Sequence, residues 1–551
     1  MPVLRECPPP RGAEGETLNV IENARSTTDT KVRVPDINPI SGMCPICVDD
    51  CNVLCEVAKS CFRGREVLYP STEYFGRSTA SSNKDFFIDW SHFQIMSELL
   101  TAKGIPEDSD LAFFENADIT TVVGSSSKRP IRMSMPVHLA GLGSTAIAKN
   151  YWAELASGAA MTGVCQVIGE NVCGMDSNAV YSNGKVQDSP DLKHRVDSYN
   201  DFWDGKNGRI VLQTNIEDAR GGADDYAVSK LGVDVVERKW GQGAKAIGGE
   251  VRVGDLAKAI DLKKRGYLVL PDPEDPDVQK AFKDGAFRSF ERHSRVGFPK
   301  YDGFLEDVDE LRSKGVKNVF LKTGAFKPEV VAFTMKCASD AKLDLVTFDG
   351  AGAGTGMSPV PMMNEMSTPG IYLFSQVIQC AKLLKEQGRF VPDVSFAGGF
   401  VNETQIYKAL ALSDLGDGPI VKSIGMARTP LLAAMKGRNF TDLAAEGKLP
   451  PKFARQYGEN PEQFFISAPE IAKRFPGKKL GKDIPWGGVG LYTYWHGRIG
   501  EGLKQLMAGT RKFKLPCIER GDLVSLTKRA HEATGVETLE MRAARVIKEI
   551  L

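Results

Sequence analysis

The chain has 551 residues, with 70 basic and 70 acidic side chains and 42% hydrophobic residues. This length predicts one large domain with appendages, or two to three domains. The neutral charge balance gives no support to a nucleic-acid or membrane-surface role, because both usually rely on an excess of basic residues.

The N-terminal region has no sign of export. Residues 1–19 carry several charges and no apolar run, so they do not form a secretory signal. No segment of the chain offers roughly 18 uncharged apolar residues in succession, so we predict no membrane span. We therefore expect a cytoplasmic protein, in which thiols stay reduced. Residues 1–40 are expected to form an extended polar arm.

A cysteine-rich segment follows, with four cysteines in the spacing C-x₂-C-x₃-C-x₃-C: Cys44, Cys47, Cys51 and Cys55. Thiolates at such spacing suit a 4Fe–4S cluster or zinc. The spacing also places all four on one helical face, where they would be buried packing residues. A straight helix would separate the first from the last by about 16 Å, so a cluster requires a bent segment. Iron–sulfur, zinc and structural packing remain the alternatives.

From about Pro136 short β-rich runs alternate with helix-like stretches. The eight candidate strands are Val137–Ala140, Cys165–Ile168, Ile210–Gln213, Val235–Lys239, Val319–Lys322, Leu345–Phe348, Val394–Ala397 and Ile420–Ile424. The amphipathic stretches between them are Thr145–Met161, Pro328–Asp340, Tyr372–Gln387 and Thr404–Leu412. The long gap between the fourth and fifth strands predicts an insertion.

Short apolar strands alternating with helices predict an α/β fold with a parallel sheet inside a layer of helices. Eight units over this length favour a closed (β/α)₈ TIM barrel, with an open doubly wound sheet as the alternative. We expect three regions: a cysteine-rich N-terminal extension (1–125), the barrel (126–436) and a mainly helical C-terminal appendage (437–551). In the appendage, Asp522–Thr534 and Glu537–Ile550 have helical spacing.

The last three predicted strands end in glycine-bearing turns, at Asp349–Pro359, Gly398-Gly399 and Gly425–Arg428. The chemistry of a parallel barrel lies at these strand ends, and the late turns commonly hold a phosphate. Glycine allows close approach of backbone N–H groups, a helix N-terminus adds partial positive charge, and Arg428 would add a charged fork. Tight turns also use glycine without any ligand.

Several turns together resemble the FMN-binding domain of glutamate synthase. The stretch Lys239–Lys245 resembles its K-x-x-Q-G-A-K motif, and Leu139–Ala146 resembles its I-S-G-M-S-F-G-A turn. Ile168–Gly174 is similar to its N-T-G-E-G-G turn, and Asp349–Pro359 to its D-G-x-x-G-G-T-G-x-x-P turn. The order and spacing agree over the whole predicted barrel.

The resemblance implies an FMN-dependent oxidoreductase that reduces an imine or 2-oxo acid, in the family 2-oxoglutarate plus ammonia to glutamate, with electrons from a reduced carrier. It assigns substrate binding and proton relay to Lys239, Lys245 and Glu170. The residues that it implies for FMN binding are Ala140, Gly141, Gln213, Lys322, Asp349, Gly350, Gly354, Thr355, Gly356, Gly398, Gly399, Gly425, Ala427 and Arg428.

The chain also departs from the family. Glu250 stands near the place of a glutamine that helps to hold 2-oxoglutarate, and a carboxylate there would repel a dicarboxylate. The family's cysteine-rich turn for a 3Fe–4S cluster, its N-terminal cysteine nucleophile and its glycine-repeat domain are missing. We therefore expect any glutaminase to be a separate subunit.

Two other functions remain open. The chain could be an FMN and iron–sulfur electron-transfer subunit of a larger redox complex, without turnover of its own, or a flavin-free scaffold. The expected partners are a small-molecule substrate, an electron donor (ferredoxin or a pyridine-nucleotide-oxidising subunit) and further copies of the chain in an oligomer. No nucleic acid or membrane is expected.

Overall fold

The computed structural model describes residues 84–551 except 107–109, 244–246, 249, 352 and 356, and also residues 61–62, 64–65, 69 and 82. The predicted metal ligands Cys44, Cys47, Cys51 and Cys55 lie outside the described residues, as do Lys245 and Gly356. In the described part of the chain, no helix is both long and apolar enough to cross a bilayer.

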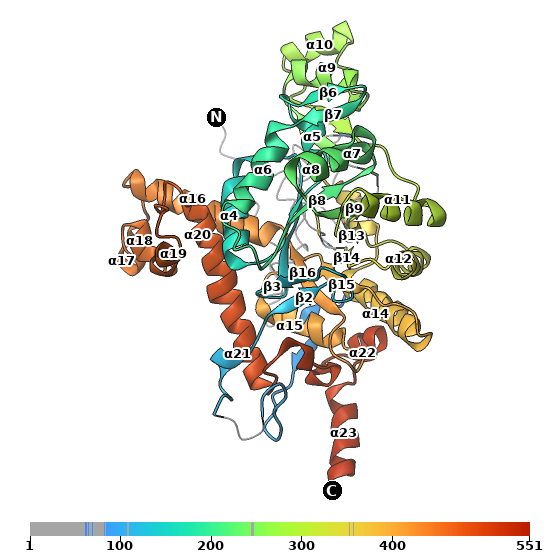
Figure 1. Ribbon diagram of the computed structural model, residues 1–551, viewed down its shortest axis with the longest axis vertical. Helices are drawn as coiled ribbons and strands as arrows, with labels where there is room; N and C mark the ends of the chain where they lie inside the picture. Colours follow the sequence, from blue (N-terminus) through green and yellow to red (C-terminus); the bar gives the residue numbers. More distant parts are fainter. Residues whose placement is uncertain are drawn as a thin grey trace, which may run out of the picture.

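Eight parallel strands close into a barrel at the centre of the molecule (Figure 1). In chain order they are β4 (Val137–Leu142), β5 (Gln166–Ile168), β8 (Ile210–Thr214), β9 (Val235–Lys239), β13 (Asn318–Thr323), β14 (Leu345–Asp349), β15 (Asp393–Ala397) and β16 (Val421–Met426). Each strand pairs with the next, and β16 closes the barrel against β4. The eight predicted strands and the TIM barrel are confirmed, and the doubly wound alternative is wrong.

Helices surround this barrel. They are α4 (Trp152–Thr162), α6 (Pro190–Asn200), α8 (Ala223–Leu231), α11 (Tyr301–Ser313), α12 (Pro328–Asp340), α14 (Gly370–Glu386), α15 (Glu403–Leu412) and α16 (Arg428–Ala445). Proline occupies the first position of α12, where its missing N–H costs nothing. The predicted helix Thr145–Met161 is divided in two, because Tyr151 leaves helical geometry between α3 (Ala146–Asn150) and α4.

The N-terminal end of the barrel is filled with hydrophobic side chains. A hairpin of β2 (Thr121–Val123) and β3 (Ile131–Met133) adds Val123, Ile131 and Met133 to the inward-facing residues of the strands. Burial of this apolar surface stabilises the closed end of the barrel. We therefore look for the functional site at the opposite end, where the barrel strands have their C-termini.

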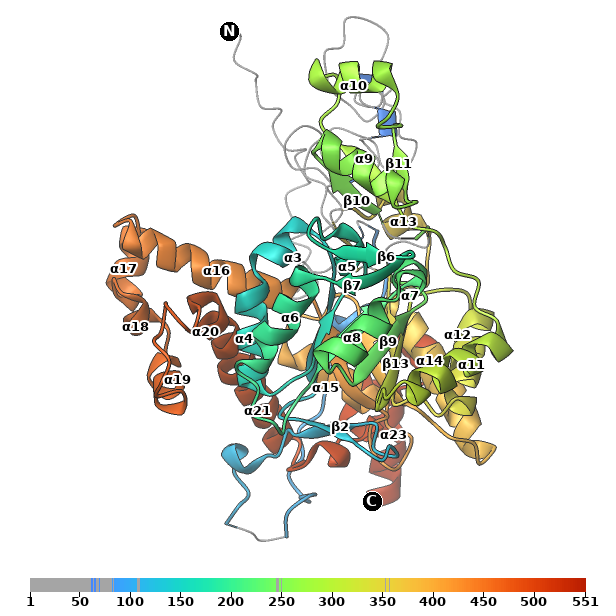
Figure 2. The same cartoon turned by 45° about the horizontal axis from the view of Figure 1, so that its top comes forward.

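The predicted insertion follows β9. It is an antiparallel sheet of β10 (Glu250–Val253), β12 (Phe290–His293) and β11 (Leu268–Leu270), in that order, with α9 (Leu256–Lys264) and α10 (Pro276–Lys283). It has its own core, in which Phe290, Ala259 and Leu262 are almost fully buried. Figure 2 shows the insertion above the barrel, near the short helices α5 (Val172–Met175) and α7 (Ile216–Gly221) that follow β5 and β8.

The C-terminal region is mainly helical. It contains α17 (Pro451–Tyr457), α18 (Pro461–Phe464), α19 (Ala468–Arg474), α20 (Trp486–Tyr492), a wider π-helical stretch (Thr493–Gly500), α21 (Glu501–Gly509), α22 (Lys528–Thr534) and α23 (Leu539–Ile550). The predicted helix Asp522–Thr534 is wrong in its first part. Leu523–Ser525 form β17, because they pair with β1 (Phe93–Ile95), far away in sequence.

Helix α20 lies directly against the barrel helices α4 and α16. A Cβ atom on Gly488 would stand 2.1 Å from the hydroxyl oxygen of Ser157 in α4. The Cα atom of Gly487 would lie 3.0 Å from a Cβ on Gly437 of α16. Glycines thus let the three helix backbones approach closely, which holds the C-terminal region on the barrel.

Candidate functional site

The C-terminal half of the barrel interior is polar. Gln213, Glu237, Lys322 and Asp349 come from the four neighbouring strands β8, β9, β13 and β14, and none is more than 7% exposed. The amide nitrogen Nε2 of Gln213 donates to Oε1 of Glu237 at 2.6 Å. Nζ of Lys322 lies 3.6 Å from Oδ2 of Asp349. Three of the predicted flavin-contacting residues therefore share one buried layer.

Charges in this layer support one another. Burial opposes the charged form of Lys322, but the nearby carboxylates of Asp349, Glu237 and Glu170 outweigh it, so the pKa of Lys322 is raised. Burial raises the pKa of Glu237, against the attraction of Lys322. The layer thus keeps a charged ammonium at the barrel centre. We did not predict Glu237 as a site residue, although a glutamate within the apolar run Val235–Lys239 was a signal for it.

The same layer contains polar atoms without a partner among the described residues. The side-chain oxygens are Oε1 of Gln213, Oγ1 of Thr347 and Oγ of Ser395. A Cβ on Gly141 would stand 2.9 Å from Oε1 of Gln213, so the predicted first turn contacts this amide. A buried polar group left unpaired costs about 1–3 kcal/mol. A buried water or a polar group of a ligand would complete the layer.

Above this layer, Lys239 and Glu170 form an ion pair. Nζ of Lys239 lies 2.7 Å from Oε1 of Glu170 and donates to Oε1 of Gln242 at 2.6 Å. The side chains of Lys239 and Glu170 are 10% and 15% exposed. The structure thus brings together two of the three residues to which the resemblance assigned catalysis.

The ion pair lines a cavity of about 690 Å³. Its apolar wall includes Trp240, Phe298 and Phe304. Most of a substrate can be buried in a cavity of this size. The Lys239–Glu170 pair would then meet the polar end of such a substrate.

The turn that carries Glu170 is held from two sides. Asn171 has a left-handed backbone (φ 66°), and its N–H donates to the carboxylate of Asp218 at 2.9 and 3.1 Å. Burial raises the pKa of Asp218 to about 7. Arg292, fully buried in the insertion, donates to Oδ1 of Asn171 at 3.3 Å. We did not predict these supports, because no sequence pattern links the insertion to the second strand turn.

The glycine turns of the last three strands meet at one rim. Ala397 pairs with Asp349 on one side and with Gly425 on the other. A Cβ on Gly398, whose φ is +108°, would stand 2.8 Å from the carbonyl oxygen of Gly350. A Cβ on Gly243 would come even closer to this oxygen, at 2.2 Å. Close packing of the backbone therefore requires these glycines whether or not a ligand binds.

The remaining residues predicted to bind FMN lie around this rim. Ala140 is buried on β4, Thr355 is exposed, and Gly354 is partly exposed. Gly399 has a left-handed backbone with φ +84°. Ala427 precedes α16, and the exposed Arg428 is its first residue. The N-terminus of an 18-residue helix thus follows the eighth strand, as the sequence predicts.

Glu250 does not present a bare charge. Its Oε1 lies 3.4 Å from Nδ1 of His293 and accepts a hydrogen bond of 3.3 Å from the hydroxyl of Tyr69. Hydrogen bonds to Glu250 and Glu291 raise the pKa of His293 to about 9. A protonated His293 therefore compensates the charge of Glu250. Glu250 should repel a dicarboxylate substrate less than an unpaired carboxylate would.

No group of three or more histidine, cysteine, aspartate or glutamate side chains within the described residues could hold a metal ion. The four cysteines proposed as ligands lie outside that part. Cys165, Cys173 and Cys337 are buried, whereas Cys380 and Cys517 are partly exposed.

The chain is thus a TIM-barrel protein with a polar lumen and an ion pair at its C-terminal mouth. Neither a family model nor a curated protein matches it. Among solved structures, it is similar to a point mutant of the active chimera of (S)-mandelate dehydrogenase (14% identity over 79% of this chain and 88% of that chain, TM-score 0.39). A soluble mutant of the membrane-associated (S)-mandelate dehydrogenase from Pseudomonas putida gives 15% identity, the same coverages and a TM-score of 0.39. Similarity this low carries no functional argument.

Proposed function

We propose that the chain is an FMN-dependent oxidoreductase of the glutamate synthase type. The observation that carries the proposal is Oε1 of Gln213, which has no hydrogen-bond partner among the described residues and lies in the same buried layer as the charged Lys322. The polar edge of a flavin ring offers an N–H donor between two carbonyl acceptors. Oε1 of Gln213 would accept a hydrogen bond from that N–H, and the ammonium of Lys322 would donate to a carbonyl oxygen. A nearby cation also favours the negative charge of a reduced flavin.

The phosphate of FMN would bind at the turns after β15 and β16. The turn Gly398-Gly399 and the N-terminus of α16 adjoin there, and Arg428 begins the helix. Backbone N–H groups and the partial positive charge of a helix N-terminus favour a phosphate. The side chain of Arg428 would add charged donors.

FMN would supply the hydride chemistry. Lys322 would remain charged at the ring edge because Asp349 lies beside it. Lys239 has three N–H donors and uses two on Glu170 and Gln242, so the third would bind a substrate carboxylate. Glu170 would orient an amine or move a proton to the reacting atom. We propose an imine or 2-oxo acid as substrate, with 2-oxoglutarate and ammonia as the first pair to assay.

A second candidate is an electron-transfer subunit that holds FMN and a 4Fe–4S cluster. The crowding of Cys44, Cys47, Cys51 and Cys55 favours it. In both cases the partner would be an electron donor, either ferredoxin or a pyridine-nucleotide-oxidising subunit, and a glutaminase would be a separate protein. The oxidoreductase would convert a small-molecule substrate, whereas the electron-transfer subunit would not.

The test is FMN binding to anaerobically purified protein, measured by flavin absorbance and fluorescence. We expect FMN to bind, and we expect Lys322→Met to weaken binding by about tenfold or more, since one hydrogen bond or charge contact is worth about 1.5–3 kcal/mol. Lys336→Met, on the surface of α12, is the matched control. Failure of the wild-type protein to bind FMN would reject both candidates.

Analysis of iron and sulfide, repeated in Cys47→Ala, tests the cluster. An assay of 2-oxoglutarate, ammonia and reduced ferredoxin tests turnover. Glutamate formation would support the oxidoreductase. Normal reduction of bound FMN without product would instead favour the electron-transfer subunit.

A further inference from the structure

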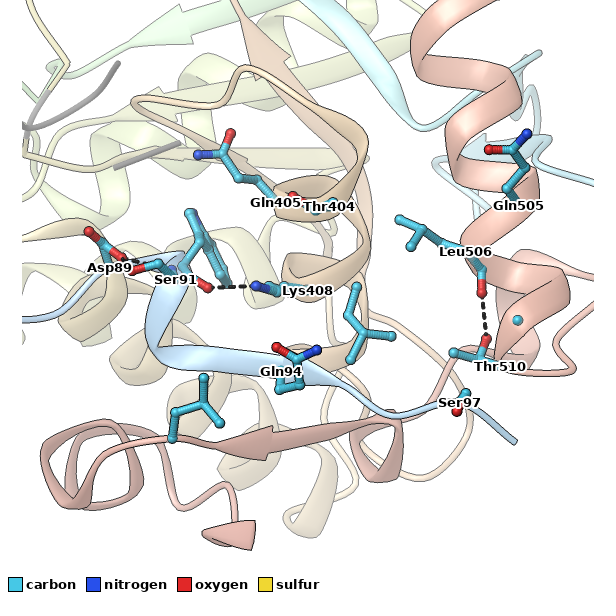
Figure 3. A pocket seen from close by; sticks show the side chains of 14 residues that line it. Asp89, Ser91, Gln94, Ser97, Thr404, Gln405, Lys408, Gln505, Leu506 and Thr510 are labelled. Atoms are coloured by element: carbon cyan, nitrogen blue, oxygen red, sulfur yellow. Dashed lines mark hydrogen bonds between the residues drawn. The ribbon is translucent and has the colours of Figure 1, made fainter. Parts of the chain in front are cut away.

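A second cavity, of about 450 Å³, lies outside the barrel. Its walls come from the N-terminal segment that contains β1, from α15 and from α21. Figure 3 shows Lys408, Gln94 and Leu506, one from each of these walls, arranged around the hollow. The cavity shares no lining residue with the one beside Lys239. It is therefore a separate cavity.

Lys408 is the cation of this cavity. Its ammonium donates to the backbone carbonyl of Trp90 at 2.8 Å and forms no ion pair with any described residue. Burial lowers the pKa of Lys408 to about 8, although Asp89 acts in the opposite direction. A half-buried ammonium with two further N–H donors and no carboxylate partner favours an anion beside it.

Asp89 lines the same cavity, but its carboxylate is already engaged. Oδ1 accepts hydrogen bonds from the N–H and hydroxyl of Ser91, at 2.7 and 2.5 Å. Nδ1 of His92 lies 3.3 Å from it. Asp89 therefore does not neutralise Lys408 directly, and its negative charge disfavours a doubly charged ligand.

The rest of the lining is amphipathic. Trp90, Ile95, Leu506 and Leu526 are apolar. The lining residues from α21 and its C-cap carry no charge; they are Gln505, Leu506, Gly509 and Thr510. Lys408 is thus the single cation among the described lining residues, next to an apolar surface. One positive charge with apolar walls fits a ligand that has one negative charge and an apolar body.

We propose that this cavity binds a small monocarboxylate with an aliphatic or aromatic body, whose carboxylate pairs with Lys408. The site is independent of the FMN proposal, because it shares no residue with the barrel mouth. It is built on α15, the helix that follows the Gly398-Gly399 turn.

Calorimetric titration of the full chain with hexanoate tests the proposal. We expect a dissociation constant of about millimolar, the range for a ligand of this size. Hexanol, which lacks the charge, and inorganic phosphate, which lacks the apolar body and carries more charge, should each bind at least about tenfold more weakly.

Lys408→Met keeps the apolar stem and removes the charge, and it should weaken hexanoate binding by about tenfold or more. Lys382→Met, an exposed lysine on α14, should leave it unchanged. Gln505→Trp adds bulk at the exposed edge of the cavity, on the α21 wall opposite the helix that carries Lys408, and should also weaken binding. If Lys408→Met does not fold, this second variant tests whether hexanoate binds in this cavity. Equal affinity in the folded variants and wild type, no binding by the wild type, or phosphate binding as tightly as hexanoate would overturn the proposal.

Discussion

The ammonium of Lys239 lies 2.7 Å from the carboxylate of Glu170, although the two residues are 69 positions apart in the chain. The pair joins the end of the fourth barrel strand to the turn after the second, across the intervening β8. Because Gln242 and Asn171 hold the two sides in place, this pair can present a fixed donor and a fixed carboxylate to a substrate.

Glu170→Gln removes the carboxylate but keeps its size. If Glu170 moves a proton during the proposed reaction, kcat should fall by about 10²–10⁴, the usual contribution of a general acid or base. FMN affinity should stay unchanged, since Glu170 is not among the proposed flavin contacts. Steady-state kinetics with 2-oxoglutarate and ammonia, together with a flavin titration, measure the two effects. Glu306→Gln, an exposed residue of α11, is the control, and full activity of Glu170→Gln would exclude the role.

Gly398→Ala tests the packing of the late turns. The backbone at Gly398 has φ +108°, and the new Cβ would stand 2.8 Å from the carbonyl oxygen of Gly350. Strain and contact together should lower the free energy of unfolding by about 2–5 kcal/mol in urea denaturation. Gly388→Ala, with φ +67° and open space around its Cβ, should cost only about 1 kcal/mol. Equal losses in both variants would show that the close contact is absent.

A double-mutant cycle tests the docking of α20 on the barrel. Gly488→Ala places a methyl group against the hydroxyl of Ser157, so overpacking should destabilise the protein by about 1–3 kcal/mol. In a Ser157→Ala background this hydroxyl is gone, and most of the loss should disappear. The expected coupling of about 1–2 kcal/mol is measured by urea denaturation of the four proteins. Additive effects would mean that the two helices do not meet at these residues.

The stability of the insertion should depend on pH through His293. Its pKa in the folded protein is raised from 6.5 to about 9 by hydrogen bonds to Glu250 and Glu291. Its contribution is therefore fully present below about pH 6.5 and is lost as the pH rises through about 9. The loss should reach about 3 kcal/mol at most. The difference in unfolding free energy between wild type and His293→Gln should shrink over this interval. A constant difference would contradict the ion pair.

The amino-acid sequence alone determined the architecture of the barrel. Its eight strands are short apolar runs that alternate with helix-like stretches, and apolar periodicity is a local property that can be read without knowing the fold. The chain order of the strands then placed the glycine turns at one rim, as Ala397 between Asp349 and Gly425 confirms.

Only the tertiary structure decided which side chains meet. It paired Glu250 with His293, joined Arg292 of the insertion to the turn of Glu170, and made Leu523–Ser525 a strand by bringing β1 beside it. It also showed that Gly243, Gly350 and Gly398 pack against one another, which the sequence could not distinguish from ligand binding. Such contacts depend on chain segments far apart in sequence, and no local pattern specifies the distance between them.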